Sequence, residues 1–307
     1  MRKQGVKANM VKVCSLYSRT KQGYYKHRSY RLQQSKLKKE ILPKVYQIRA
    51  EQPYVGTRKL KVYLERYGIN VGRDKLFSIL DENNLLSPVY RRKCITSKGN
   101  RSKYPNLIKK LGKAQRVGEI IASDITYLST RKGFVYLSLT SDHYSNAVLG
   151  YSLQNNLSSE GPKQALKRAV KSLGNNKPGI HHSDHGSQYT SNEFLKLLDD
   201  KGFLPSMTGV GKCYDNAKAE RINGILKHEL NLKSIFKDYN EALLYVEEAI
   251  KIYNNQRLIG SKGYRTPADL MTNLSIVDHF RSEKNYPLST PLRALHLSSC
   301  SRGVDSG

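Results

Sequence analysis

Apolar residues in the N-terminal third of the chain recur at helical spacing. Between Lys36 and Asn84, three runs each carry an apolar stripe at intervals of three to four residues, which predicts three helices. Glycines at 68 and 72 mark a tight turn between the second and third of these helices. Three short helices with such a turn are typical of a helix-turn-helix domain. A plain three-helix packing module with a solvated charged face fits the same pattern.

From Gly118 the apolar pattern changes to the alternation that is typical of strands. Residues 119–128 and 133–142 are predicted to form a hairpin, and residues 146–153 a third strand. This layout predicts an α/β domain with a mixed five-stranded sheet, of the ribonuclease H-like kind. The remaining predicted elements are a helix over 160–173, a strand within 178–184, a helix opened by Ser191, a strand over 203–207, a helix that carries Glu220, and a helix over 238–256.

The charge distribution adds boundaries to this pattern. Residues 1–39 carry twelve Lys or Arg and no acid, which indicates a basic arm with one short helix near Met10–Tyr17. The predicted segments are the basic N-terminal arm (1–39), the helix-turn-helix domain (40–95), a basic linker (96–117), the catalytic core (118–272) and a disordered tail (273–307).

The overall balance of 53 Lys and Arg against 25 Asp and Glu gives a net charge of +28, which predicts a polyanionic partner. No apolar run approaches the length of a membrane span, and the N-terminus lacks a secretory signal, so we expect no membrane partner. Four scattered cysteines with no paired spacing favour a reduced, cytoplasmic protein. Nucleic acid is the partner that this composition favours. The residues expected to contact it are Arg73 and Lys75, at the start of the third helix, and Arg91, Arg92 and Lys93, in the segment leading into the linker.

Three carboxylates stand at or near the ends of predicted elements. Asp124 lies within a predicted strand among apolar neighbours, Asp184 follows the fourth strand, and Glu220 lies on a helix. Thirty-five residues, positions 185 to 219, separate the last two. Each acid taken singly is more often structural. Together they form an all-oxygen ligand set that suits Mg²⁺ or Mn²⁺, and two such ions can activate and stabilise the oxygens of a phosphodiester displacement.

Several nearby residues have competing interpretations. Lys227 lies two helical turns after Glu220, where it either clamps a DNA phosphate or is an ordinary solvated lysine. Asp142 is interpreted as a turn residue. The cluster His181, His182 and His185 suggests zinc, but no further His or Cys follows at finger spacing, which favours a role in positioning the loop or contacting phosphate.

These segments resemble a known family. The sequences SDITYL, HSDHGSQYTS and YDNAKAERINGILKHEL, with YNNQR and GYRTPADL downstream, are similar to the integrase core of bacterial insertion-sequence transposases. The greatest similarity is to the second-reading-frame product of the insertion sequence three family, a relative of retroviral integrases, and it covers residues 40–272. The family's tryptophan before the first Asp is replaced here, with Ile121 and Ala122 in that stretch. Its Pro-His after YNNQR is replaced by Leu258 and Ile259, and a later leucine by Lys262.

The resemblance implies a function. It makes Asp124, Asp184 and Glu220 the metal-binding catalytic triad, and Lys227, with Asn216, a DNA contact. The expected activity is Mg²⁺-dependent cleavage of element ends followed by strand transfer, by a homo-oligomer that binds terminal inverted repeats and target DNA. The upstream-frame protein of the same element is a further expected partner. Two rivals are a ribonuclease H-like endonuclease that only hydrolyses, and an inactive DNA-binding relative.

Overall fold

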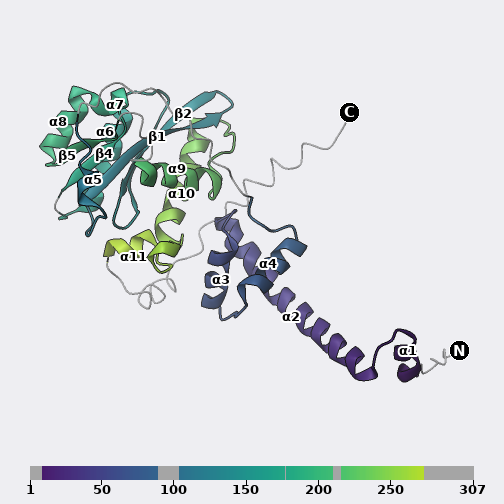
Figure 1. Ribbon diagram of the computed structural model, residues 1–307. Coiled ribbons are helices and arrows are strands. Elements are labelled where there is room, and N and C mark those ends of the chain that lie inside the picture. The colour runs from purple at the N-terminus through teal and green to yellow at the C-terminus, as the bar shows by residue number, and fades with distance from the viewer. Residues whose placement is uncertain (1–8, 89–103, 177, 210–215, 273–307) are drawn as a thin grey trace. The chain divides into compact units, whose positions relative to one another are not determined.

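The computed structural model describes residues 9–88, 104–176, 178–209 and 216–272 (Figure 1). These residues fall into two compact units, one formed by Met1–Ile48 with Leu60–Leu86 and the other by Arg49–Lys59 with Ser87–Gly307. The predicted DNA contacts Arg91, Arg92 and Lys93 lie outside the described residues, as does the predicted tail from 273 to 307. No helix in the described ranges is both long enough and apolar enough to span a membrane.

The first unit is built of helices. The short helix predicted near Met10–Tyr17 is present as α1 (Met10–Leu16), and it is followed by α2 (Lys21–Glu51), α3 (Thr57–Arg66) and α4 (Arg73–Glu82). The helix predicted from Lys36 begins fifteen residues earlier, at Lys21, so the second half of the basic arm is helical. The apolar pattern missed this part because the buried residues of α2 begin only at Ile41, and a helix that is polar all round has no periodic stripe.

A tight turn at Gly68 and a shared apolar core join the three predicted helices. Gly68 adopts a φ of +79°, which a residue with a side chain rarely adopts, and the Ile69 amide donates to the Leu64 carbonyl at 2.9 Å. The chain thereby leaves α3 and enters α4 within a few residues. Fully buried side chains on α2, α3 and α4 form the core: Ile41, Val45, Leu60, Leu64, Leu76, Ile79 and Leu80.

A mixed five-stranded sheet forms the centre of the second unit. Its strands are β1 (Ile120–Thr130), β2 (Gly133–Asp142), β3 (Val148–Gln154), β4 (Ile180–Ser183) and β5 (Leu204–Met207). Their spatial order is β3-β2-β1-β4-β5. The first three strands are antiparallel neighbours, whereas β4 and β5 run parallel to β1. This confirms the sheet predicted from the sequence, with its ribonuclease H-like layout.

Helices cover both faces of this sheet (Figure 1). On one face, Leu137 and Leu139 of β2 pack in a core with α9 and α10. On the other, Ile121 and Leu149 pack in a core with α6 and α8. The helices of this unit are α5 (Ile108–Leu111), α6 (Glu160–Leu173), α7 (Ser187–Thr190), α8 (Asn192–Asp200), α9 (Ala217–His228), α10 (Tyr239–Asn255) and α11 (Pro267–Thr272), with a 3₁₀ turn at Gly260–Lys262.

The pairing of β1 leaves part of one edge open. On the β4 side, β1 is paired only over Ile120–Ala122, and the next pairing on that side is the isolated bridge from Thr130 to Phe236. Among the described residues, no strand therefore covers β1 between these two points. Asp124 lies in this open stretch.

Candidate active site

Asp124 lies on β1, two residues beyond Ala122, the last residue paired with β4. Its carboxyl is buried and accepts two hydrogen bonds from the protein. Its Oδ2 accepts a hydrogen bond from the Asn223 side-chain amide at 2.7 Å, and its Oδ1 accepts one from the Ile125 amide at 3.0 Å. Burial and, to a smaller extent, the charges of Asp184 and Glu220 together raise the pKa of Asp124 to about 7, in spite of the lowering effect of the Asn223 bond. A carboxyl in this setting is costly to ionise unless a cation compensates it.

Asp184 directly follows β4, the strand that pairs with the start of β1. In this parallel pairing Ala122 stands opposite His182, and Asp124 and Asp184 each come two residues after that last pair. The Asp184 Oδ1 accepts from the Gly186 amide at 3.0 Å, which bends the chain into α7. The pairing therefore brings both acids to the same end of the two strands, and the charge of Asp184 raises the pKa of Asp124.

Glu220 reaches the same place from a helix. It lies in the first turn of α9, three residues before Asn223, and residues three apart share a helix face. Asn223 touches Asp124 directly, and the charge of Glu220 raises the Asp124 pKa. The three acids predicted from the sequence therefore come from β1, the end of β4 and α9, and the charges of the last two act on Asp124.

The donor set fits a hard divalent cation in its chemistry. Besides burial, the charges of Asp184 and Glu220 raise the pKa of Asp124, and this repulsion is of the kind that a bound Mg²⁺ or Mn²⁺ removes. As the side chains stand, no group of three His, Cys, Asp or Glu within the described ranges is close enough to hold a metal ion. The acids are therefore gathered but not closed into a cage.

Lys227 lies beside this site, at the last turn of α9. Its Nζ is 4.5 Å from the centroid of the Tyr127 ring. Burial lowers the Lys227 pKa, and the charge of Asp124 partly offsets this. The predicted position two turns after Glu220 thus brings its ammonium group within electrostatic reach of the first acid.

Asn216, also predicted to contact DNA, bonds within the protein. It occupies the N-cap position of α9, is only 3% exposed, and donates from its side chain to the Ser123 carbonyl at 3.2 Å instead of capping the helix. Because Ser123 precedes Asp124, this bond ties the start of α9 to the strand that carries the first acid. The side chain is thus bonded to the protein in this structure, and its contact with DNA stays a prediction.

The histidine cluster is part of the sheet interior. The His181 Nε2 lies 2.8 Å from the Ser123 Oγ, and the His182 Nδ1 lies 2.9 Å from the Ser206 Oγ. Burial lowers the pKa of His181 to about 3, so its ring is neutral. His185 follows Asp184 in the loop. The first two rings lie within β4 and bond to its neighbouring strands, and a role of the cluster in positioning the loop or contacting phosphate stays a prediction.

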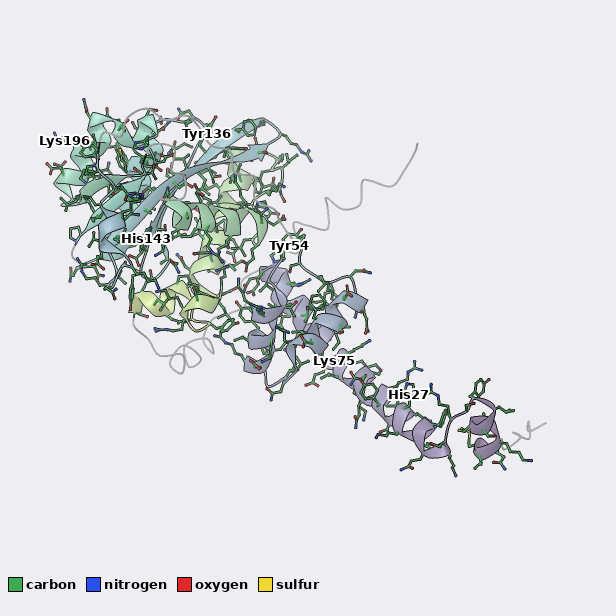
Figure 2. The ribbon with its side chains drawn as sticks, in the orientation of Figure 1. His27, Tyr54, Lys75, Tyr136, His143 and Lys196 are labelled. Atoms are coloured by element: carbon green, nitrogen blue, oxygen red, sulfur yellow. The ribbon has the colours of Figure 1, made fainter. Side chains whose placement is uncertain are left out.

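Asp142 and two basic residues of the first unit occupy the elements predicted for them, a turn and the start of the third predicted helix. Asp142 accepts from the Ser145 amide and hydroxyl, both at 2.7 Å, which confirms it as a turn residue. Arg73 and Lys75 open α4; Arg73 pairs with Asp74 at 2.7 Å, and the Lys75 Nζ lies 5.9 Å from the Tyr30 ring centroid (Figure 2).

Two residues of the site were missed from the sequence. Asn223 holds Asp124, and its spacing of three from Glu220 is the signal that could have found it. Tyr189 is 2% exposed, and its hydroxyl has no hydrogen-bond partner among the described residues. Burial, and then the charges of Asp124 and Asp184, raise its pKa well above the usual value. No feature of the sequence separates it from the other tyrosines.

The motif after α10 is a packed structural unit. Arg257 is 6% exposed and donates twice to one Glu229 oxygen, at 3.1 and 2.9 Å. Leu258 and Ile259, which replace the residues usual in the resembled family, are both buried, and the Ile259 amide donates to the Arg265 carbonyl at 3.0 Å. The two departures therefore add apolar residues to the core.

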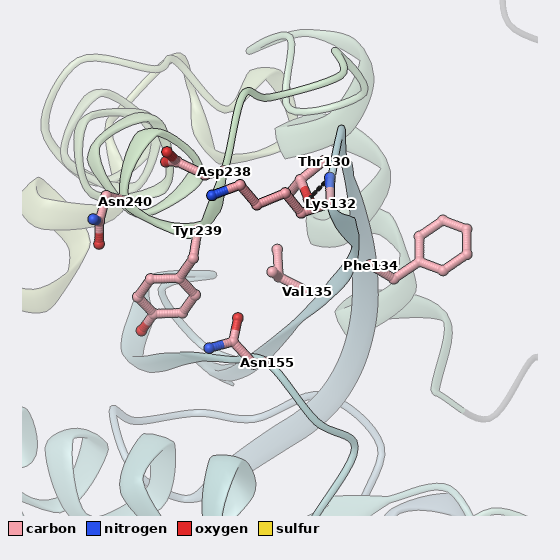
Figure 3. A pocket seen from close by; sticks show the side chains of 8 residues that line it. All are labelled: Thr130, Lys132, Phe134, Val135, Asn155, Asp238, Tyr239 and Asn240. Atoms are coloured by element: carbon pink, nitrogen blue, oxygen red, sulfur yellow. Dashed lines mark hydrogen bonds between the residues drawn. The ribbon is translucent and has the colours of Figure 1, made fainter.

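A cavity of about 440 Å³ opens at the outer end of the β1–β2 hairpin (Figure 3). None of the three carboxylates lines it, so it is separate from the acidic site. Its lining residues are Thr130, Lys132, Phe134, Val135, Asn155, Asp238, Tyr239 and Asn240.

Sequence comparisons relate this chain to integrase core domains and to proteins of bacterial insertion elements. Two family models, both described as an integrase core domain, match residues 114–213 and 201–267. A 31 kDa protein of insertion element IS600 from Shigella sonnei is 32% identical over 83% of this chain and 96% of its own. The transposase of IS904 from Lactococcus lactis is 31% identical over 59% of this chain and 72% of its own. The catalytic core of HTLV-2 integrase in complex with magnesium aligns with a TM-score of 0.43 and 23% identity, over 52% of this chain and 99% of that one.

Proposed function

Because the chain belongs to the insertion-sequence transposases with an integrase core domain, we propose that it binds the ends of its element and performs metal-dependent cleavage and strand transfer on them. The observation that carries this proposal is the meeting of three acids from three separate elements. Asp124 and Asp184 each come two residues after the last pair of β1 with β4, and the charges of Asp184 and of Glu220 on α9 both raise the pKa of Asp124.

Asp124, Asp184 and Glu220 are the residues that would hold the metal, either Mg²⁺ or Mn²⁺, as one or two ions. When bound, such ions lower the pKa of an attacking oxygen and stabilise the leaving oxygen of a phosphodiester. Asn223 fixes the direction of the Asp124 carboxylate and favours its ionised form. Asn216 ties the start of α9 to β1 and so keeps Glu220 near the sheet.

Lys227 is assigned to the DNA. Its ammonium group lies beside Asp124 and on the same helix as Glu220, so it would meet a phosphate next to the bond that reacts. Arg73 and Lys75 at the start of α4, and the basic residues Arg91, Arg92 and Lys93, are proposed to hold the terminal inverted repeats. Two element ends must be joined to one target, so we propose that the working form is a homo-oligomer, with the upstream-frame protein of the element as a further partner.

A strand-transfer assay tests the proposal. Labelled element ends and target DNA are incubated with the full chain and Mg²⁺, and cleaved and joined products are separated on a denaturing gel. Joined products are expected from the natural protein, and the substitution Glu220→Gln should abolish cleavage and joining by about a thousandfold or more, because it removes a metal ligand. Glu248→Gln on α10, 4.0 Å from Lys251, is the matched control and should keep both activities.

The rival functions predict different gels. Cleavage without joining by the natural protein would indicate an endonuclease and would overturn the strand-transfer proposal. Neither product, with DNA binding intact, would indicate an inactive relative. Full activity in the Glu220→Gln protein would show that the acidic site is wrongly assigned.

A further inference from the structure

Two aromatic side chains lie exposed on the β1–β2 hairpin. Tyr127 is 58% exposed and Phe134 57%, and their ring centroids are 5.2 Å apart with an angle of 72° between the planes. We call this pair the hairpin shelf. In such an edge-to-face arrangement, the ring that contributes its edge keeps both faces clear of its partner. More than half of each residue's surface therefore remains available to a ligand.

Strand geometry places the shelf on the face away from the larger core. Phe134 stands opposite Ser129, two residues from Tyr127, so both rings lie on the same side of the hairpin. The intervening residues Leu128 and Val135 point the other way and are buried in the core with α9 and α10. Figure 3 shows Val135 directed into the cavity at the hairpin and the Phe134 ring directed away from it.

The hairpin shelf is next to the acidic site. Tyr127 follows Asp124 by three residues, which is about 10 Å along a strand. The Lys227 Nζ lies 4.5 Å from the Tyr127 ring centroid, and the Asp124 charge acts on the same ammonium group. No described strand covers β1 between Ala122 and Thr130 on this side, so Lys227 can reach Tyr127 around the open edge.

The charges around the shelf favour a polyanionic ligand. Arg131 and Lys132, in the turn that joins β1 to β2, are both exposed, and Lys227 lies at the Tyr127 ring. A second copy of this chain, with a net charge of +28, would meet this basic rim with repulsion. A nucleic acid matches both the rings and the cations, because every base has a face that stacks on an aromatic ring and a phosphate beside it.

We propose that the hairpin shelf stacks an unpaired base at the end of the DNA, while Lys227 binds the phosphate next to that base. The base must be unpaired, since bases inside a duplex are already covered on both faces by their neighbours. This inference rests on the proposed function, because it names how the same site holds its DNA end. In this proposal, Tyr127 and Phe134 hold the terminal base apart from the complementary strand.

A binding experiment without catalysis tests the shelf. Two probes carry the fluorescent base 2-aminopurine at the terminus, one as a blunt duplex and one with a short single-stranded extension that contains the probe base. The full chain is added stepwise to each probe in EDTA, which excludes metal-dependent chemistry, and the fluorescence of the probe is measured. The natural protein should quench the extended probe and bind it about tenfold more tightly than the blunt one, as expected for one stacked base.

Substitutions then locate the effect. The double change Tyr127→Ala with Phe134→Ala should remove the preference and the quenching, and leave the affinity for the blunt duplex unchanged. Tyr127→Phe keeps the ring and should keep the preference. Leu244→Ala removes a side chain that is 63% exposed on α10 and serves as the matched control. Thermal melting of each protein shows that it is folded.

Three outcomes would overturn the proposal. In the first, the double variant retains the preference for the extended probe. In the second, it loses affinity for both probes equally. In the third, its sedimentation changes while the preference stays, and the shelf would then be a self-association surface. A natural protein that fails to join DNA but still prefers the extended probe would contradict the proposed function and leave the shelf in place.

Discussion

At the scale of single residues, the acidic site opposes folding in the absence of a cation. Asp124 retains some exposed surface, yet its carboxyl lies deep among protein atoms, and burial together with two neighbouring acids raises its pKa to about 7. Its ordinary value in an unfolded chain is about 4. Between these two values the unfolded chain releases the proton while the folded protein keeps it. Folding stability therefore falls as the pH rises from about 4 to about 7 and levels off above that window.

Replacement of Asp124 by Asn should remove this cost. At pH 8 without divalent metal, we expect Asp124→Asn to unfold with a free energy higher by roughly 2 to 4 kcal/mol, and the difference should vanish near pH 4. Urea denaturation of both proteins across this pH range measures it. Added Mg²⁺ should stabilise the natural protein and have little effect on the variant. Equal stability at all pH values would show that Asp124 is not buried as an acid.

Asn223 should control the ionisation of Asp124 through their 2.7 Å hydrogen bond. This bond lowers the Asp124 pKa, so the substitution Asn223→Ala should move the acidic limb of the pH–activity profile to higher pH. Strand transfer at neutral pH should fall by about tenfold, since the lost bond is to a charged group. Asn240→Ala, an exposed asparagine on α10, should change neither property. A drop in activity with an unmoved pH profile would contradict this role.

The residues predicted from the sequence and those missed differ in a physical way. Asp124, Asp184 and Glu220 could be found because an acid at the end of an apolar run is unusual and their spacing is specific to one family. Asn223 carries a weaker signal, its spacing of three from Glu220, and Tyr189 carries none, since a phenol within a helix is ordinary until its neighbours are known. Asn216 was assigned to DNA because its position in the motif says nothing about its burial, and only the fold shows that its amide turns inward to Ser123.

At the scale of elements, the packing of α6 on the sheet depends on a glycine of β3. A Cβ on Gly150 would lie 2.1 Å from the Ala165 carbonyl oxygen and 2.5 Å from the Ala169 nitrogen, both backbone atoms of α6. Gly150→Ala must therefore push the helix away from the sheet, and we expect a loss of about 3 kcal/mol or more in the free energy of unfolding. Chemical denaturation measures this loss.

Gly224 provides the opposite case on α9. No heavy atom lies within 4 Å of a Cβ built there, so Gly224→Ala should stabilise the protein by about 0.5 to 1 kcal/mol through the higher helix propensity of alanine. A stabilising Gly150→Ala would contradict the close contact between β3 and α6. The sequence marks Gly150 as unusual within a predicted strand, but it does not say which helix approaches it.

Elements with an apolar stripe or a cap could be predicted, and those without either could not. The cap expected at Ser191 is present, with its side chain accepting from the Phe194 amide, and Asp238 caps the helix predicted from that residue by accepting from the Glu241 amide. The first half of α2 was missed because the buried residues of this helix, Ile41, Val45 and Ile48, all lie in its second half, so the first half has no apolar stripe. The short pairing of β4 with β1 could not be predicted from the sequence either, because the length of a strand pairing depends on the elements that pack beside it.

At the scale of the whole molecule, the excess of positive charge should govern how DNA is bound. Each phosphate neutralised by a Lys or Arg releases a condensed counterion, so the affinity for DNA should fall steeply as the salt concentration rises. This loss should be the same for the natural protein and for Glu220→Gln, because an acid of the reaction site does not contact phosphates. A weak salt dependence would contradict a phosphate-based interaction for a chain of net charge +28.

The two basic residues at the start of α4 should contribute a defined part of this dependence. If Arg73 and Lys75 each contact a phosphate, replacing both with Ala should lower the slope of log affinity against log salt by about 2. Base contacts would act differently, since the variant would then lose its preference for the terminal inverted repeats over a scrambled duplex at every salt concentration. Filter binding with both duplexes over a salt series separates the two cases.

Arg73 already pairs with Asp74, so Asp74→Ala should free the Arg73 guanidinium group and strengthen binding to both duplexes. An unchanged slope and preference in the double variant would exclude α4 from the DNA interface.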